Sequence, residues 1–194
     1  MPGERAVRAG RRIAQAGGLE LMLPECQKGL GQIINSPNSQ DLIEGVQVAP
    51  LTVFPDDRGY FLELQRIGKG IAAEFPPATT QVSAALNHPG AIKAFHYHLH
   101  QTDCWNPVRG LLQVALADLR TDSSTFGWRN TLYIGPLRPW QLLVPPGVAH
   151  GYKVIGTEDA LLVYLTDRFY NPQDEGRIAY DDASINYDWE TQRK

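Results

Sequence analysis

The amino-acid sequence predicts an all-β protein built as a sandwich or a barrel. Short segments rich in β-branched and aromatic residues follow one another at close intervals from residue 41 onward, and turn sequences separate them. The chain also carries 18 glycines and 14 prolines among its 194 residues, a content that favours many turns over long helices. Many short strands joined by turns are typical of β-sandwiches and β-barrels.

Local residue patterns give the expected elements in order. Residues 45–54 alternate and are rich in β-branched side chains, so they are expected to form the first strand, which ends at the turn sequence of residues 55–59. Another strand is expected at 60–64, followed by a short helical turn at 71–74 that two prolines end. Further strands are expected at 80–85, 91–99, 110–119, 131–134, 141–144, 151–154 and 160–166. The polar and aromatic tail is expected to hold one more helical turn at 181–184.

The first part of the chain differs from the remainder. Four arginines lie within the first 12 residues, where apolar periodicity is weak, and loop-forming residues follow at 33–39. We therefore expect residues 1–40 to form a partly flexible N-terminal extension and residues 41–194 to form a single domain. An arginine-rich organelle transit peptide is the alternative interpretation, whereas the apolar core of a secretory signal is missing.

Composition and charge exclude several classes of protein. The formal net charge of −3 argues against a general nucleic-acid or membrane-surface binder. No apolar run approaches the roughly 20 residues of a membrane span. The two cysteines, Cys26 and Cys104, make no disulfide framework, so a reducing cytoplasmic location is expected.

Histidines at spacing two mark the candidate functional region. Because successive side chains of a strand alternate between its faces, His96, His98 and His100 would share one face. Asp103 follows closely, and His150 comes after a Pro-Pro-Gly turn. Such nitrogen and oxygen donors can bind a divalent metal ion, and an imidazole can also act as a base near neutral pH.

The sequence pattern alone also allows these residues to have purely structural roles. The histidines could face solvent, which would leave Phe95, Tyr97 and Leu99 to form the core. His150 could be a hydrogen-bonded structural histidine, and Asp103 could cap a loop.

Two spaced motifs resemble the signature of the cupin superfamily. The first has Gly90, five residues, His96-x-His98, four residues, Asp103, six residues and a further glycine, and the second is Pro-x-Gly-x-x-His at 145–150. Asp103 stands where this signature usually has glutamate. The resemblance implies a double-stranded β-helix barrel of the jelly-roll type with short peripheral helical turns.

A narrower resemblance covers residues 45–190. The sequence is similar to the dTDP-4-dehydrorhamnose 3,5-epimerase family, cupins that invert two carbons of a nucleotide-linked 4-keto sugar. The matching segments occur in the family's order at residues 54–63, 81, 118–127, 145–152 and 164–175.

This resemblance implies roles for particular residues. His96 would remove a proton from carbon next to the keto group, and Asp167 would hold its imidazole in the required tautomer, although Asp167 could instead form a surface ion pair with Arg168. The enolate formed would need a donor or a cation at its oxygen. The residues expected to bind substrate are Arg58 and Lys93, on the diphosphate, and Phe61, Glu63 and Gln81, on the nucleotide.

The sequence departs from the family pattern at several of these positions. His98 replaces a glutamine, Asp103 replaces a lysine that steadies the oxyanion, Ser83 replaces a nucleotide-binding asparagine and Leu143 stands where the resemblance places the general-acid tyrosine. Lys93 likewise replaces an arginine, which exchanges a planar fork for a point charge. These departures put inversion at both carbons in question, and inversion at one carbon only is the alternative.

A metal ion would account for two of the departures together. His98, Asp103 and His150, alone or with His96, would suit Zn²⁺, Mn²⁺, Fe²⁺, Ni²⁺ or Co²⁺. The ion would polarise the keto oxygen as a Lewis acid. If His96 is a ligand, its lone pair is not free to take a proton, and His100 is then the alternative base.

The sequence is therefore consistent with three functional hypotheses. The first is a nucleotide-sugar epimerase acting on a dTDP-4-keto-6-deoxyhexose, for which the resemblance requires no cofactor and implies a homodimer with an N-terminal strand crossing to its neighbour. The second is a metal-dependent cupin enzyme of another class, such as a dioxygenase or sugar isomerase. The third is a non-catalytic sugar-nucleotide binding protein.

Overall fold

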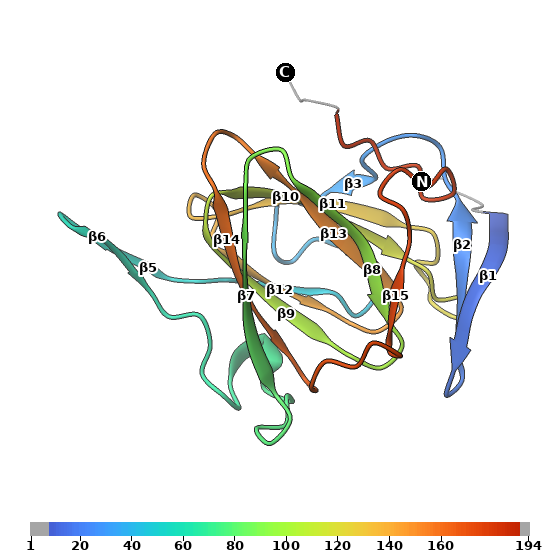
Figure 1. The fold of residues 1–194 in the computed structure, drawn as a ribbon, viewed down its shortest axis with the longest axis horizontal. Helices are drawn as coiled ribbons and strands as arrows, with labels where there is room; N and C mark the ends of the chain where they lie inside the picture. Colours follow the sequence, from blue (N-terminus) through green and yellow to red (C-terminus); the bar gives the residue numbers. More distant parts are fainter. Residues whose placement is uncertain (1–7, 191–194) are drawn as a thin grey trace.

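Two β-sheets face each other in the computed structural model, which describes residues 8–190 (Figure 1). The strands are β1 (Arg8–Ala16), β2 (Leu19–Glu25), β3 (Gln32–Ile33), β4 (Gln47–Pro50), β5 (Val53–Asp56), β6 (Gly59–Leu62), β7 (Gln81–Asn87), β8 (Ile92–His98), β9 (Asp103–Arg109), β10 (Leu111–Asp118), β11 (Arg129–Ile134), β12 (Trp140–Val144), β13 (Val148–Ile155), β14 (Ala160–Thr166) and β15 (Glu175–Arg177). One sheet has the order β15-β8-β13-β10-β11-β3, and the other has the order β4-β12-β9-β14-β7. The predicted all-β jelly-roll class is confirmed.

Helical structure is confined to one short 3-10 turn in the described part of the chain, η1 (Gly70–Ala72). This turn lies close to the helical turn expected at 71–74. The second expected turn, at 181–184, is formed by non-helical turns instead. Within residues 8–190, no helix is long and apolar enough to cross a membrane.

Beyond residue 40, the strand predictions differ from the structure in three places. The segment 45–54 is divided between β4 and β5, because the chain leaves the five-stranded sheet after Pro50. Strand β9 was not expected, since its polar residues and proline mask the strand pattern. Strand β15 was also missed, because three residues of sequence Glu-Gly-Arg carry no apolar alternation.

The main core lies between the two sheets, and β10 shows why. Its even-numbered residues Leu112, Val114 and Leu116 are fully buried in this core, while Ala115 and Ala117 are buried on the other face of the same strand. Adjacent side chains point to opposite faces, so a strand with both faces covered reads as a continuous apolar run.

A second apolar cluster covers the outer face of the six-stranded sheet. There Phe95 and Tyr97 of β8 pack with Tyr187 and Trp189 of the C-terminal segment. The phenyl ring of Phe95 meets the Tyr187 ring edge-on at a centroid distance of 6.2 Å. On the opposite face of β8, His98 is buried and His96 is half-buried, so the histidines do not lie on a fully solvated face opposite a Phe95 and Tyr97 core.

The N-terminal residues include regular structure that the sequence did not predict. Strands β1 and β2 form an antiparallel hairpin, and β3 pairs in parallel with β11. Leu21 and Leu23 of β2 are buried in the cluster on the outer face of the six-stranded sheet. Arg5, which contributed to the prediction of a flexible extension, lies outside the described residues.

The β5–β6 hairpin projects away from both sheets (Figure 1). It carries Phe54 and Phe61, whose rings are 6.1 Å apart at their centroids. Phe54 is 56% exposed and Phe61 is 65% exposed. Large apolar side chains gathered on a projecting arm are typical of an interaction site.

Candidate active site

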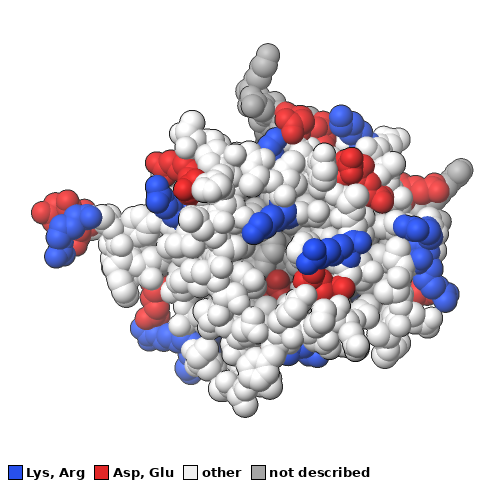
Figure 2. All heavy atoms as spheres, in the orientation of Figure 1, with Lys and Arg blue, Asp and Glu red and all other residues white. Residues whose placement is uncertain are grey.

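A cavity of about 200 Å³ opens between the two sheets. In Figure 2, basic and acidic side chains gather beside a hollow near the centre of this face. The cavity is lined by residues of both sheets, namely Gln81, Ala85, Lys93, His96, His98, Gln101, Asp103, Trp105, His150, Gly151, Tyr152, Leu162, Tyr164, Thr166, Tyr170 and Glu175.

Strands β8 and β13 bring the histidines into the cavity from one wall. His96 and His98 share the inner face of β8, as their spacing predicts, and His150 lies directly opposite His96 in the antiparallel register. The two strands approach closely at Gly151, where a Cβ atom would collide with Ala94. His100 follows the end of β8, is exposed and does not line the cavity, so the structure does not favour it as an alternative base.

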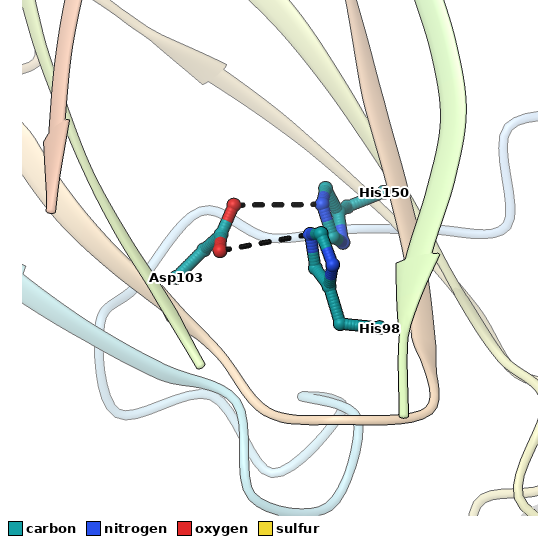
Figure 3. Close-up of side chains that lie close together, drawn as sticks. All are labelled: His98, Asp103 and His150. Atoms are coloured by element: carbon teal, nitrogen blue, oxygen red, sulfur yellow. Dashed lines mark ion pairs between the residues drawn. The ribbon is translucent and has the colours of Figure 1, made fainter. Parts of the chain in front are cut away.

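A buried cluster of His98, Asp103 and His150 occupies the inner part of the cavity (Figure 3). One carboxylate oxygen of Asp103 lies 3.7 Å from His98 Nε2, and the other lies 3.6 Å from His150 Nε2. The three ligand atoms lie within 4.8 Å of one another. His96 is not a member of this group.

Hydrogen bonds show how the imidazole nitrogens nearest Asp103 are engaged. His150 Nδ1 lies 3.0 Å from the Val148 carbonyl oxygen, to which it can donate a proton, so Nε2 keeps its lone pair. His98 Nε2 lies 3.2 Å from the Gln101 amide nitrogen and accepts its proton, so a cation bound there would take the place of this amide. Both Nε2 atoms lie within 3.7 Å of the Asp103 carboxylate. This donor set fits a divalent cation, and the carbonyl partner of His150 provides the orienting contact that metal-ligating histidines need.

The Asp103 carboxylate is held in place by two donors. The Gln101 amide donates to one oxygen at 2.7 Å, and the Trp105 indole donates to the other at 3.1 Å. Such bonds stabilise a buried negative charge. They also orient the carboxylate toward the histidines.

Burial favours the neutral imidazole at His96 and His150. Desolvation is the largest cause that lowers the pKa of His96, followed by the neighbouring His150, while Glu175 opposes this shift. Desolvation likewise lowers the pKa of His150, against the charge of Asp103. A neutral imidazole at the wall of a cavity is able to accept a proton.

The structure shows contacts of Asp167 other than the predicted pairing with His96. The Asp167 carboxylate accepts a hydrogen bond from the Thr102 N–H at 3.0 Å and another from Arg168 at 3.1 Å, so the alternative of an ion pair with Arg168 is the one observed. Glu175 Oε2 instead lies 3.6 Å from His96 Nδ1. Asp167 lies at the end of β14, outside the cavity lining.

The residues expected to bind substrate fall into two groups. Gln81 and Lys93 line the cavity. Arg58 and Phe61 lie on the projecting β5–β6 hairpin, and Glu63 follows it. Arg58 pairs there with Asp56, and Glu63 pairs with Arg66, so within one chain these residues stand apart from the histidines.

The general-acid position also differs from the expectation. Leu143 points to the outer face of the five-stranded sheet, where it packs with Phe75 and Cys104. The cavity obtains hydroxyl groups from other residues, among them Tyr164 on β14 and Tyr152 on β13. The Tyr152 hydroxyl accepts a hydrogen bond from Asn87 at 2.9 Å, whereas the Tyr164 hydroxyl has no hydrogen-bond partner within residues 8–190.

Sequence reasoning assigned no site role to Gln101, Trp105, Tyr164 or Glu175, although Tyr164 and Glu175 belong to the matching segment 164–175. Strand alternation on β14 could have identified Tyr164, because it shares a face with Leu162 and Thr166. The contact of Glu175 with His96 joins residues 79 positions apart, and no local pattern predicts it.

Comparisons with known proteins agree with this fold. The sequence model of dTDP-4-dehydrorhamnose 3,5-epimerase matches residues 40–194. The spore coat polysaccharide biosynthesis protein SpsL of Bacillus subtilis is 44% identical over 153 residues, which cover 78% of this chain and 99% of SpsL.

Solved structures show the same relationship. A dTDP sugar isomerase from Desulfovibrio desulfuricans superposes with a TM-score of 0.71 at 25% identity, covering 78% of this chain and 94% of that one. A double mutant of ChmJ, a 3'-monoepimerase from Streptomyces bikiniensis solved in complex with dTDP, has a TM-score of 0.67 at 27% identity, covering 76% and 75% of the two chains. The match to the family model over most of the sequence shows that the chain belongs to the dTDP-4-dehydrorhamnose 3,5-epimerase family.

Proposed function

We propose that this protein is a nucleotide-sugar epimerase that acts on a dTDP-4-keto-6-deoxyhexose. The observation that carries the proposal is the cavity, which places the His96 imidazole on one sheet and the Tyr164 hydroxyl on the other. Inversion at carbon requires a proton to leave one face and another proton to arrive at the opposite face. Acid and base groups on opposing walls meet this requirement.

The reaction begins with proton removal next to the keto group. His96 accepts the proton from carbon, and the electron pair of the broken C–H bond forms an enolate whose negative charge lies on the keto oxygen. Tyr164 then donates its proton to the opposite face of the same carbon, which restores the ketone in the inverted configuration. The imidazolium and tyrosinate return to their starting states by exchange with solvent.

The number of inverted carbons is a separate part of the proposal. Carbons 3 and 5 both flank a keto group at carbon 4, so the same pair of residues can serve either carbon if the sugar is presented suitably. Among the structural neighbours, ChmJ is described as a 3'-monoepimerase. Counting the deuterium atoms that the product gains in D₂O distinguishes one inverted centre from two.

We further propose that His98, Asp103 and His150 bind a divalent metal ion. Its support is the buried donor set, in which two imidazole nitrogens and a carboxylate lie close together. When bound, the ion would supply Lewis-acid stabilisation of negative charge on the keto oxygen, the role for which the family uses a lysine at position 103. His96 stays outside this set and remains available as the base.

The projecting β5–β6 hairpin supports a homodimer. Arg58 was expected to hold the diphosphate, and Phe61 and Glu63 were expected to contact the nucleotide, yet all three stand apart from the cavity of their own chain. A partner's hairpin laid across the cavity would bring the same residues to a substrate there. Light scattering tests the dimer, and a higher KM for Phe61→Ala with kcat retained tests the contact.

We also expect the protein to work in the cytoplasm. Cys26 and Cys104 are free thiols in the structure. Free cysteines are typical of proteins in a reducing compartment.

Hydrogen exchange into the sugar tests the proposed function. In D₂O, the wild-type protein should introduce deuterium next to the keto group of a dTDP-4-keto-6-deoxyhexose, and His96→Asn should abolish this exchange while affinity for the nucleotide sugar is kept. His88→Asn is the matched control, because His88 is an exposed histidine paired with Asp159 on the surface. Exchange by His96→Asn at the wild-type rate would refute the role of His96 as base.

A further inference from the structure

We propose that Glu175 is the positioning residue that fixes the imidazole of His96, in the place expected for Asp167. The inference rests on the proposed function of His96 as base. It adds a residue whose contact with His96 is formed only in the folded chain.

Strand pairing brings Glu175 to His96. Strand β15 runs antiparallel to β8 at the edge of the six-stranded sheet, with Glu175 opposite His98 and Arg177 opposite His96. The Glu175 side chain reaches back along the sheet, so that Oε2 lies 3.6 Å from His96 Nδ1. It is 12% exposed and lines the same cavity.

The second carboxylate oxygen has a partner of its own. Glu175 Oε1 accepts a hydrogen bond from Arg177 Nε at 2.8 Å. This bond leaves Oε2 directed toward the imidazole. A carboxylate is acceptor-only when ionised, so it favours the imidazole tautomer that carries its proton on Nδ1.

This tautomer is the one that the reaction needs. With the proton on Nδ1, the lone pair of Nε2 is free to accept the proton from carbon. Hydrogen bonds in substrate-free active sites are often long and shorten when the substrate is bound. A separation of 3.6 Å is therefore compatible with an orienting bond in the working complex.

Backbone contacts hold β15 firmly against β8. Phe95 N–H donates to the Ile178 carbonyl at 2.8 Å, and Ile178 N–H donates to the Phe95 carbonyl at 2.9 Å. At the other end, Leu99 N–H donates to the Asp174 carbonyl at 3.1 Å. Gly176 packs on the Tyr97 ring, where a Cβ atom has no room. Glu175 is thus presented from a segment that is fixed on both sides.

The competing carboxylate is occupied elsewhere. Asp167 accepts hydrogen bonds from the Thr102 N–H and from the Arg168 guanidinium. The first of these bonds ties Thr102, immediately before β9, to the end of β14. Both bonds give Asp167 a structural role that does not involve the imidazole.

Imidazole ¹⁵N NMR on the free protein at pH 8 tests the tautomer directly. The wild-type protein should show His96 with its proton on Nδ1. Glu175→Gln places an amide N–H beside Nδ1 and should shift the proton to Nε2. Asp159→Asn is the matched control, because it removes the carboxylate beside the surface residue His88 and should leave the His96 signals unchanged. Because this measurement needs no substrate, its result is separate from the success or failure of the proposed reaction.

Kinetics provide the second readout. Glu175→Gln should lower kcat for deuterium incorporation by about 10²-fold or more, because the base is then held in the wrong tautomer. KM should stay within about threefold of the wild-type value, since a larger rise would indicate lost substrate binding. Glu175→Asp, which keeps the carboxylate, should recover part of this loss and serves as the second variant if Glu175→Gln does not fold. An unchanged tautomer in Glu175→Gln, or an Asp167→Asn loss of kcat larger than that of Glu175→Gln, would overturn the proposal.

Discussion

The interior between the two sheets has an apolar half and a polar half. In the apolar half, Leu112, Leu116 and Leu132 are fully buried among other aliphatic side chains. In the polar half, His98 and Asp103 are buried almost as completely, with exposures of 6% and 5%. The same strands run through both halves, so strand geometry alone does not separate them.

Strand β9 contributes one side chain to each half of the interior. Asp103 and Trp105 share its inner face two residues apart, yet the carboxylate belongs to the polar half and the indole packs into the apolar core. The Trp105 N–H bonds to Asp103 at 3.1 Å and so joins the two halves. Burying aliphatic surface stabilises the fold, while burying ionisable groups costs free energy unless they are paired. The polar half therefore depends on the hydrogen bonds that its buried groups make.

Tyr164→Phe should give the largest effect on the polar half. Removing the hydroxyl deprives the proposed reaction of its acid, so inversion should slow by about 10²- to 10⁴-fold. Deuterium incorporation with retained configuration should continue, because His96 is intact. NMR of the sugar in D₂O measures both rates. Inversion at the wild-type rate would show that another group donates the proton.

Leu112→Ala should give the largest effect on the apolar half. Leu112 is fully buried, and truncation leaves a cavity that costs about 2–5 kcal/mol of the free energy of unfolding. Urea denaturation measures the loss. Leu112 lies opposite Val154 and Ile134 rather than opposite a histidine, so the kcat of the folded variant should stay near the wild-type value. A loss below about 1 kcal/mol would indicate that the two halves are not packed as the structure has them.

Metal addition should stabilise only a protein with an intact polar cluster. Zn²⁺ or Mn²⁺ at a free concentration 100-fold above its Kd should raise the free energy of unfolding by about 2.7 kcal/mol. Asp103→Asn should abolish most of this gain, whereas Leu112→Ala, in the apolar half, should keep it. Thermal unfolding with and without chelator provides the measurement, and metal content by elemental analysis provides a second one. An equal gain in wild type and Asp103→Asn would place the ion elsewhere.

Leu143→Tyr should have the smallest effect on activity, because Leu143 lies in neither half of the interior. Leu143 is packed on the outer face of the five-stranded sheet, so a larger ring there should cost about 1–3 kcal/mol through overpacking. It should not raise the rate of inversion, because the new hydroxyl points away from the cavity. A rise in kcat would show that position 143 does reach the substrate.

The thiol of Cys104 packs beside Leu143 on the face of β9 opposite the cavity. Burial raises the pKa of the Cys104 thiol to about 12. A buried neutral thiol behaves as a small apolar side chain. Cys104 therefore belongs to packing, although it is adjacent in sequence to Asp103 in the cavity cluster.

Local sequence determined the fold class and much of the histidine wall. The alternation of β8 places His96 and His98 on one face whatever the partner strands are, because successive residues of a strand point to opposite sides. The spacing of glycines, prolines and β-branched residues likewise determined most strand positions. Asp103 and His150 were grouped with His98 from motif spacing, and the structure brings these three side chains together.

Only the tertiary structure decided which side chains complete the site. Glu175 reaches His96 because β15 pairs with the edge of β8, and this pairing between distant segments leaves no local trace in the sequence. Tyr164 faces the cavity while Leu143 faces away from it, a choice set by how β14 and β12 are oriented in their sheet. The β5–β6 hairpin stands clear of the barrel for the same reason: its direction depends on packing and partners rather than on the residues that form it.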